Sequence, residues 1–180
     1  MKRVSIIFCV FTTLLFGSCR QHEADRVHIQ KSNIKKDNPY IEWNRNNVER
    51  EEEDISFFIQ RYGWDMQKTG TGLYIQTLEE GDGPHPKEGD IISLEYTTIL
   101  LTGDTVYHSA KDGLKRFKVD KSDEPAGLNE AVKMLRKNAK ARIVIPSFLA
   151  YGIAGDGQNI RGKVSLAMYI KVIDIQESKL

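Results

Sequence analysis

His108 and Ser109 are adjacent side chains that could support nucleophilic catalysis, because a histidine can take the proton from a serine. No Asp or Glu is placed by a motif to orient His108, and the sequence contains no G-x-S-x-G, so a hydrolase is disfavoured. Gly81-Asp82-Gly83 is not a phosphate-binding loop, since no G-K-[ST] follows it. The histidines lack metal-ligand spacing among themselves or with paired carboxylates: His22, His28, His85 and His108. We therefore expect neither a metal nor another cofactor.

Cys19 is a second reactive group, and its surroundings indicate a modification rather than catalysis. Two basic residues precede an apolar run, residues 4–16, that is too short to span a bilayer, and small residues lead to the cysteine. The arrangement resembles a bacterial lipoprotein signal over residues 1–18, which implies cleavage after Ser18 and lipidation of Cys19. A plain secretory signal is the alternative.

The remaining cysteine and the next segment agree with export. Cys9 lies inside the apolar run and would be removed with it, which leaves Cys19 without a partner for an intramolecular disulfide. Residues 19–37 are polar, charged and poor in aromatic side chains, so we expect a flexible tether there.

A helix, a strand and a loop are predicted in succession between Pro125 and Gly152. The helix is indicated by apolar residues at i, i+3, i+4 and i+7: Leu128, Ala131, Val132 and Leu135. Ser122 or Asp123 can cap its first turn, and Asn138 suits a left-handed residue at its end. Residues 141–145 alternate in the period of a strand.

Further segments have the alternation and composition of β-strands. They are residues 73–79, 90–101, 105–108, 116–119 and 163–176. In the last of them, Met168 and Ile170 should face one side of a sheet, and Ala167 and Tyr169 the other. Many strands and one amphipathic helix predict an α+β fold in which a twisted antiparallel sheet wraps around the helix.

Residues 38–63 predict a longer helix that begins at Asn38-Pro39 and ends at Gly63. Its apolar residues recur every seven positions: Ile41, Val48, Ile55 and Tyr62. The stripe either packs on the domain that follows or forms a surface for self-association or a partner. It is short for an independent coiled coil.

Three motifs together resemble the FKBP family of peptidyl-prolyl cis-trans isomerases. They are Gly127-Leu128-Asn129-Glu130-Ala131, Ile143-Val144-Ile145-Pro146 and Ala150-Tyr151-Gly152, in this order and at this spacing. The resemblance covers residues 64–176 and implies a half-barrel domain over residues 64–180, in the version that follows a Mip-like N-terminal extension.

The resemblance also implies a pocket that binds the proline ring and favours the twisted amide. The positions that match the family's pocket are Tyr96, Tyr107, His108, Phe117, Leu128, Tyr151, Ile160 and Met168. Tyr151 matches the tyrosine that donates a hydrogen bond to the substrate carbonyl, while Leu128 and Met168 match the apolar floor.

Departures from the family pattern occur at this same site. His108 stands where the family usually has Asp, and it cannot supply an anion. Pro125 falls near a position that offers a backbone N–H, which proline lacks. Ile160-Arg161-Gly162 replaces an I-P-P turn.

The sequence therefore predicts a lipid-anchored isomerase of the cell envelope, facing the periplasm from the outer membrane. It would assist the folding of exported proteins by binding X-Pro segments. The alternative is a binding module or chaperone that keeps the pocket and has lost most turnover, because His108 replaces the carboxylate. Charges are scattered and the formal net charge is +1, so we do not expect nucleic acid as a partner.

Overall fold

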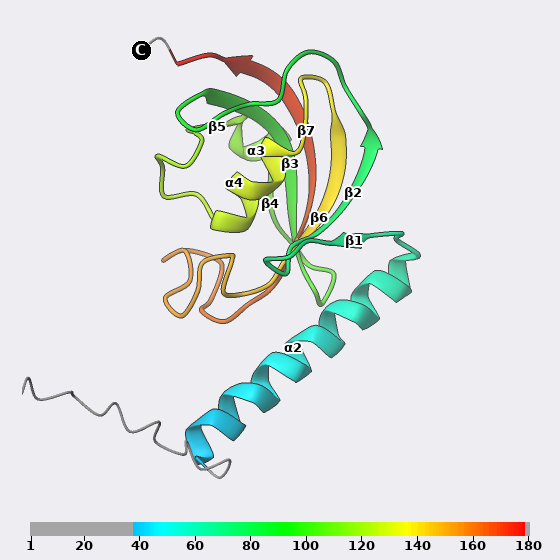
Figure 1. The fold of residues 1–180 in the computed structure, drawn as a ribbon, viewed down its shortest axis with the longest axis vertical. Helices are drawn as coiled ribbons and strands as arrows, with labels where there is room; N and C mark the ends of the chain where they lie inside the picture. The colour runs from blue at the N-terminus through cyan, green and yellow to red at the C-terminus, as the bar shows by residue number, and fades with distance from the viewer. Residues whose placement is uncertain (1–37, 179–180) are drawn as a thin grey trace, which may run out of the picture. The chain divides into compact units, whose positions relative to one another are not determined.

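The computed structural model describes residues 38–178, and the predicted signal segment, the tether and Cys19 lie outside this range. Most of the described chain belongs to an antiparallel sheet and the helices that pack on it (Figure 1). The helices are α2 (Pro39–Tyr62), α3 (Ser109–Asp112) and α4 (Ala126–Lys133). The strands are β1 (Gln67–Lys68), β2 (Tyr74–Glu79), β3 (Ile91–Leu100), β4 (Thr105–His108), β5 (Lys115–Lys118), β6 (Lys140–Ile145) and β7 (Leu166–Gln176).

The strands lie in the order β1-β2-β6-β7-β3-β4, and β5 also pairs with β3. Every pairing is antiparallel, and the long strands β3 and β7 are matched along their whole length. Because side chains alternate between the two faces of a strand, this register decides which residues share a face. The predicted α+β fold, an antiparallel sheet around one short helix, is confirmed.

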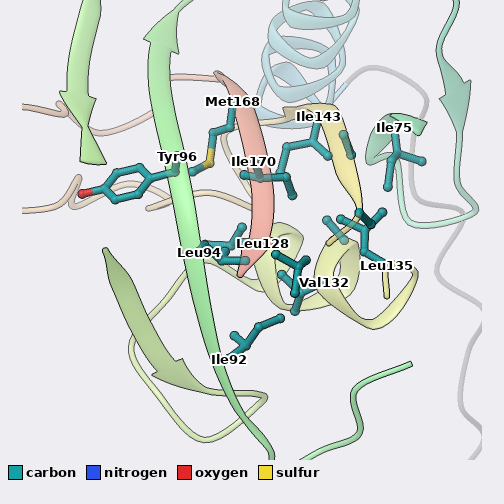
Figure 2. Close-up of a cluster of buried hydrophobic side chains, with 14 of the residues drawn as sticks. Ile75, Ile92, Leu94, Tyr96, Leu128, Val132, Leu135, Ile143, Met168 and Ile170 are labelled. Carbon is teal, nitrogen blue, oxygen red and sulfur yellow. The ribbon is translucent and has the colours of Figure 1, made fainter. Parts of the chain in front are cut away.

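The inner face of the sheet packs on α4. Leu128, Val132 and Leu135 are almost fully buried, so the predicted apolar stripe is the one that enters the core. Figure 2 shows these side chains facing aliphatic residues of the sheet, Ile92 and Ile143 among them. Met168 and Ile170 belong to this inner core, as the alternation in β7 predicts.

The outer face of the sheet packs on the second half of α2. Ile55 and Phe58 are 2% and 1% exposed, and they form a separate cluster with Trp64 and with the β7 residue Ala167. The first half of the helix is different, since its apolar side chains stay largely exposed: Ile41, Trp43 and Val48. The stripe thus packs on the domain in one half and leaves an apolar surface in the other.

The structure corrects the predicted ends of α4. Neither Ser122 nor Asp123 caps it, because Pro125 is the N-cap and no side chain caps the first turn. The Asn129 amide instead donates to the carbonyl oxygens of Glu124 and Pro125, and so fixes the start of the helix from within. Asn138 is left-handed, with φ of 67°, but α4 already ends at Lys133. The turn bonds of Met134 and Leu135 to carbonyls three residues back end the helix early.

Candidate functional site

A cavity of about 540 Å³ opens beside α4 on the inner side of the sheet. Its walls combine aromatic rings, an apolar floor and charged groups. The lining residues are Tyr96, Thr98, Tyr107, Lys115, Asp123, Glu124, Pro125, Leu128, Tyr151, Gly155, Asp156, Gln158, Leu166 and Met168. The cavity is therefore built from strands β3, β4, β5 and β7, from the start of α4, and from the loop between β6 and β7.

The sheet register brings the wall residues together. Thr98 of β3 pairs with Tyr107 of β4 on one side and with Met168 of β7 on the other, so the three side chains share a face. Leu128 of α4 completes the floor and is fully buried. Tyr151 follows the tight turn at Pro146, where successive backbone N–H groups bond to carbonyls three to five residues back.

Two tyrosine hydroxyls face the cavity without a protein partner. Within residues 38–178, the hydroxyls of Tyr96 and Tyr151 form no hydrogen bond with another side chain or with the backbone. In Figure 2 the Tyr96 hydroxyl lies at the end of the ring farther from the labelled aliphatic residues. Both groups are therefore available as donors to a bound carbonyl oxygen.

Burial raises the pKa values of both hydroxyls. It raises the pKa of Tyr151 strongly, and the carboxylates of Glu124 and Asp156 raise it further. Burial also raises the pKa of Tyr96, with a smaller contribution from the carboxylates of Asp112 and Glu124. A phenol with a raised pKa stays neutral and donates a hydrogen bond at physiological pH.

Tyr107 differs, because its hydroxyl donates to Oδ2 of Asp156 over 2.5 Å. Asp156 lies in the loop after Tyr151, and its Oδ1 accepts the backbone N–H groups of Gln158 and Ile160. Also in the lining, Nζ of Lys115 lies 2.8 Å from Oε1 of Glu124 and 5.2 Å from the centre of the Tyr96 ring. The cavity thus holds fixed charges beside its aromatic wall.

The family comparison agrees with this geometry. A model of the FKBP-type peptidyl-prolyl cis-trans isomerase family matches residues 83–173, from the segment before β3 into β7. The chain belongs to the FKBP family.

Curated FKBP relatives are longer proteins, and the match covers only part of each. The chain is 31% identical over 110 residues to a probable FKBP-type peptidyl-prolyl cis-trans isomerase FkpA of Neisseria meningitidis, which covers 61% of this chain and 40% of that protein. It is 27% identical over 108 residues to the outer membrane protein MIP of Legionella longbeachae, which covers 60% of this chain and 46% of the relative. The chain therefore spans less than half the length of these relatives.

Solved structures share the FKBP fold. The crystal structure of FkpA from Escherichia coli matches with a TM-score of 0.64 at 24% identity. The match covers 78% of this chain and 65% of the FkpA chain. A peptidyl-prolyl cis-trans isomerase from Pseudomonas syringae matches with a TM-score of 0.62 at 24% identity. The match covers 74% of this chain and 96% of the Pseudomonas chain.

The structure places some of the predicted FKBP pocket residues around the cavity and others outside its lining. Those that line it are Tyr96, Tyr107, Leu128, Tyr151 and Met168. Phe117 is 6% exposed and belongs to the inner core, while Ile160 is 4% exposed in the loop between β6 and β7, and neither lines the cavity.

His108 faces away from the cavity. It neighbours Tyr107 on β4, and alternate side chains of a strand point to opposite faces. Its Nδ1 accepts the N–H of Ala110 and so caps the short helix α3. In this structure the cavity's carboxylates come from other positions.

Several cavity residues are absent from the sequence prediction. They are Thr98, Lys115, Asp123, Glu124, Asp156 and Gln158. The one signal that could have drawn attention to Asp156 is its place in Gly155-Asp156-Gly157, and that pattern indicates only a turn. Among residues 38–178, no group of His, Cys, Asp and Glu side chains could hold a metal ion.

Proposed function

We propose that the protein catalyses the cis-trans isomerisation of X-Pro bonds in the cavity beside α4. The uncatalysed reaction is slow because the amide must lose its resonance, at a barrier of ~18–20 kcal/mol. A site that binds the twisted amide more tightly than the planar one lowers this barrier without a nucleophile or a metal.

The observation that carries the proposal is the unpartnered Tyr151 hydroxyl above an apolar floor. Leu128 and Met168 provide a surface for a proline ring, and the removal of water there favours the less polar twisted carbonyl. Tyr151 can donate to that carbonyl oxygen, and Tyr96 offers a second donor. In this mechanism the two hydroxyls orient the substrate and no proton is transferred.

Isomerase turnover on a short Leu-Pro peptide tests the proposal. We expect the purified protein to exceed the uncatalysed rate, and Tyr151→Phe to lower kcat/KM about tenfold, the equivalent of one lost hydrogen bond of ~1.4 kcal/mol. Tyr62→Phe removes a hydroxyl from a tyrosine outside the cavity lining and serves as the matched control. An equal loss in both variants, or none in Tyr151→Phe, would refute the assigned role.

The second candidate is a binding module or chaperone with little turnover. His108 favours it, because this side chain is occupied as the cap of α3 and cannot provide a carboxylate. A native protein that binds a Leu-Pro peptide in an NMR titration but does not accelerate its isomerisation would support this candidate. Native turnover well above the uncatalysed rate would exclude it.

We further propose that Cys19 is lipidated and anchors the protein in the cell envelope, facing the periplasm, where exported X-Pro-containing chains would be its clients. Cys19 lies outside the described residues, so the proposal depends on the sequence pattern alone. None of the helices in residues 38–178 is long and apolar enough to cross a bilayer. Metabolic labelling with an alkyne fatty acid should label the protein and not Cys19→Ser. Equal labelling of both would exclude the anchor.

The exposed first half of α2 is the surface that we propose for self-association. Trp43 and Val48 are 54% and 55% exposed there. Sedimentation should show concentration-dependent dimers that Val48→Glu weakens. Asn46→Glu, an exposed site on the same helix, is the control. A native protein that stays monomeric at high concentration would refute the proposal.

A further inference from the structure

The cavity wall carries more negative than positive charge. The charged lining residues are Lys115, Asp123, Glu124 and Asp156. The ammonium group of Lys115 lies 2.8 and 3.0 Å from the two carboxylate oxygens of Glu124, so these two charges offset each other. Within residues 38–178, Asp123 and Asp156 have no cationic partner. Two negative charges are therefore left uncompensated where a ligand would bind.

Asp156 is held in place by neutral donors. Its Oδ2 accepts the Tyr107 hydroxyl, and its Oδ1 accepts the N–H groups of Gln158 and Ile160 over 2.9 and 2.8 Å. Burial alone would raise the pKa of Asp156, but these hydrogen bonds lower it below its usual range. Neutral donors orient a carboxylate without cancelling its charge, so Asp156 presents a fixed anion to the cavity.

Tyr96 provides an independent sign that the cavity takes a ligand. The residue is only 8% exposed, yet its hydroxyl forms no hydrogen bond within the described chain. The hydroxyl itself is open to the cavity, so it can donate to an acceptor that enters there. A peptide carbonyl is such an acceptor, and the charges on the wall would then act on the adjoining side chain.

We propose that the cavity selects X-Pro segments in which X is Lys or Arg, and that Asp123 and Asp156 determine this preference. The inference depends on the function proposed above, since it names the substrate class for the same cavity. Opposite charges about 6 Å apart, at an effective dielectric constant of about 40 to 80, favour the cationic residue by about three- to tenfold.

Peptides that differ only at X test the preference. Lysine, norleucine and glutamate should be compared, because norleucine has a lysine-like chain without the charge. We expect kcat/KM and the affinity from NMR titration to be three- to tenfold higher for lysine than for norleucine, and lowest for glutamate. The preference should fall towards unity in about 1 M salt, where the screening length is about 3 Å.

Charge-removing variants identify the residues responsible. Asp123→Asn should lower the ratio of lysine to norleucine, and it leaves the loop intact because Asp123 forms no hydrogen bond within the described chain. Asp156→Asn should lower the ratio as well. Asp65→Asn is the matched control, an exposed aspartate outside the cavity lining, and should keep the native ratio.

The outcomes distinguish a failure of the isomerase proposal from a failure of the proposed preference for a cationic residue. Turnover on norleucine without a preference for lysine, or a ratio that Asp123→Asn leaves unchanged, overturns the charge selection and leaves the isomerase standing. If no peptide is turned over, the isomerase is refuted, and the affinities alone decide the preference. Equal binding of all peptides, or binding of none, overturns the preference.

Discussion

Replacing Glu51 by alanine should destabilise the protein by about 2–3 kcal/mol, because one carboxylate of α2 connects two distant segments. Its Oε1 accepts the backbone N–H of Ser147 over 2.6 Å and also the hydroxyl of Ser165. A hydrogen bond to a charged group contributes about 1.5–3 kcal/mol, and we take the lower end for each because the site is partly exposed. Alanine recovers roughly 0.4 kcal/mol in helix propensity.

Glu53→Ala is the matched control, since Glu53 is exposed on the same helix and accepts no hydrogen bond within the described chain. Urea unfolding at constant m-value measures both variants. Turnover should fall only in Glu51→Ala, because the Ser147 carbonyl accepts the N–H of Gly152 and so holds the turn that contains Tyr151. A difference in unfolding free energy below about 0.5 kcal/mol between the variants would refute the reasoning.

Three further predictions concern the loop between β6 and β7, the stability at low pH, and the packing of α2 on the sheet. Gly155→Ala should weaken peptide binding about tenfold or more, because the new Cβ would lie 2.2 Å from the carbonyl oxygen of Ile160. Gly157→Ala is the control, since Gly157 has the same φ of +74° but open space around it, and this variant should bind more tightly; equal affinities in an NMR titration would exclude the steric cause. Hydrogen bonds from two backbone N–H groups lower the pKa of Asp90, so the stabilisation from its carboxylate is present above pH ~4 and is lost as the pH falls through the folded pKa. Asp90→Asn should therefore weaken the pH dependence of the urea midpoint between pH ~5 and ~2, and an unchanged pH dependence would contradict this. Phe58→Ala should cost about 3–5 kcal/mol in urea unfolding and the 61%-exposed Phe57→Ala much less, so similar losses would show that α2 does not pack as described.

The strands were the most predictable part of the fold. An apolar residue at every second position has one low-energy arrangement, in which that row faces the core. The alternation in residues 90–101 therefore predicts that Ile92, Leu94 and Tyr96 share one face, and all three are buried. The same argument predicts that Met168 and Tyr169 face opposite sides of the sheet, and the structure places Met168 in the inner core and Tyr169 beside the cluster on α2. A strand that buries one face therefore shows an apolar residue at every second position of its sequence.

The short elements left no such pattern. Helix α3 spans only Ser109–Asp112 and buries no residue, so it has no apolar period to detect. Strand β1 has two exposed residues. The stripe of α2 could not be assigned one role, because half of it packs on the sheet and half does not.

The charged part of the site was unpredictable for another reason. Lys115 and Glu124 are nine positions apart and meet only because β5 and the start of α4 flank the same cavity. Asp156 contacts Tyr107 across forty-nine positions. Such contacts arise from tertiary register rather than from local spacing, and no local pattern of residue types indicates them.

The packing of α2 on the outer face determines where the autonomous unit of this protein begins. The family match starts at residue 83, but a fragment that begins there would lose α2 and β2. It would leave β6 as an unpaired edge strand and uncover the apolar side chains of Val144 and Ala167. An open edge next to a bare apolar face is a site for aggregation. A stable fragment of this chain should therefore keep the second half of α2, which covers this apolar face of the sheet and keeps it from contact with other chains.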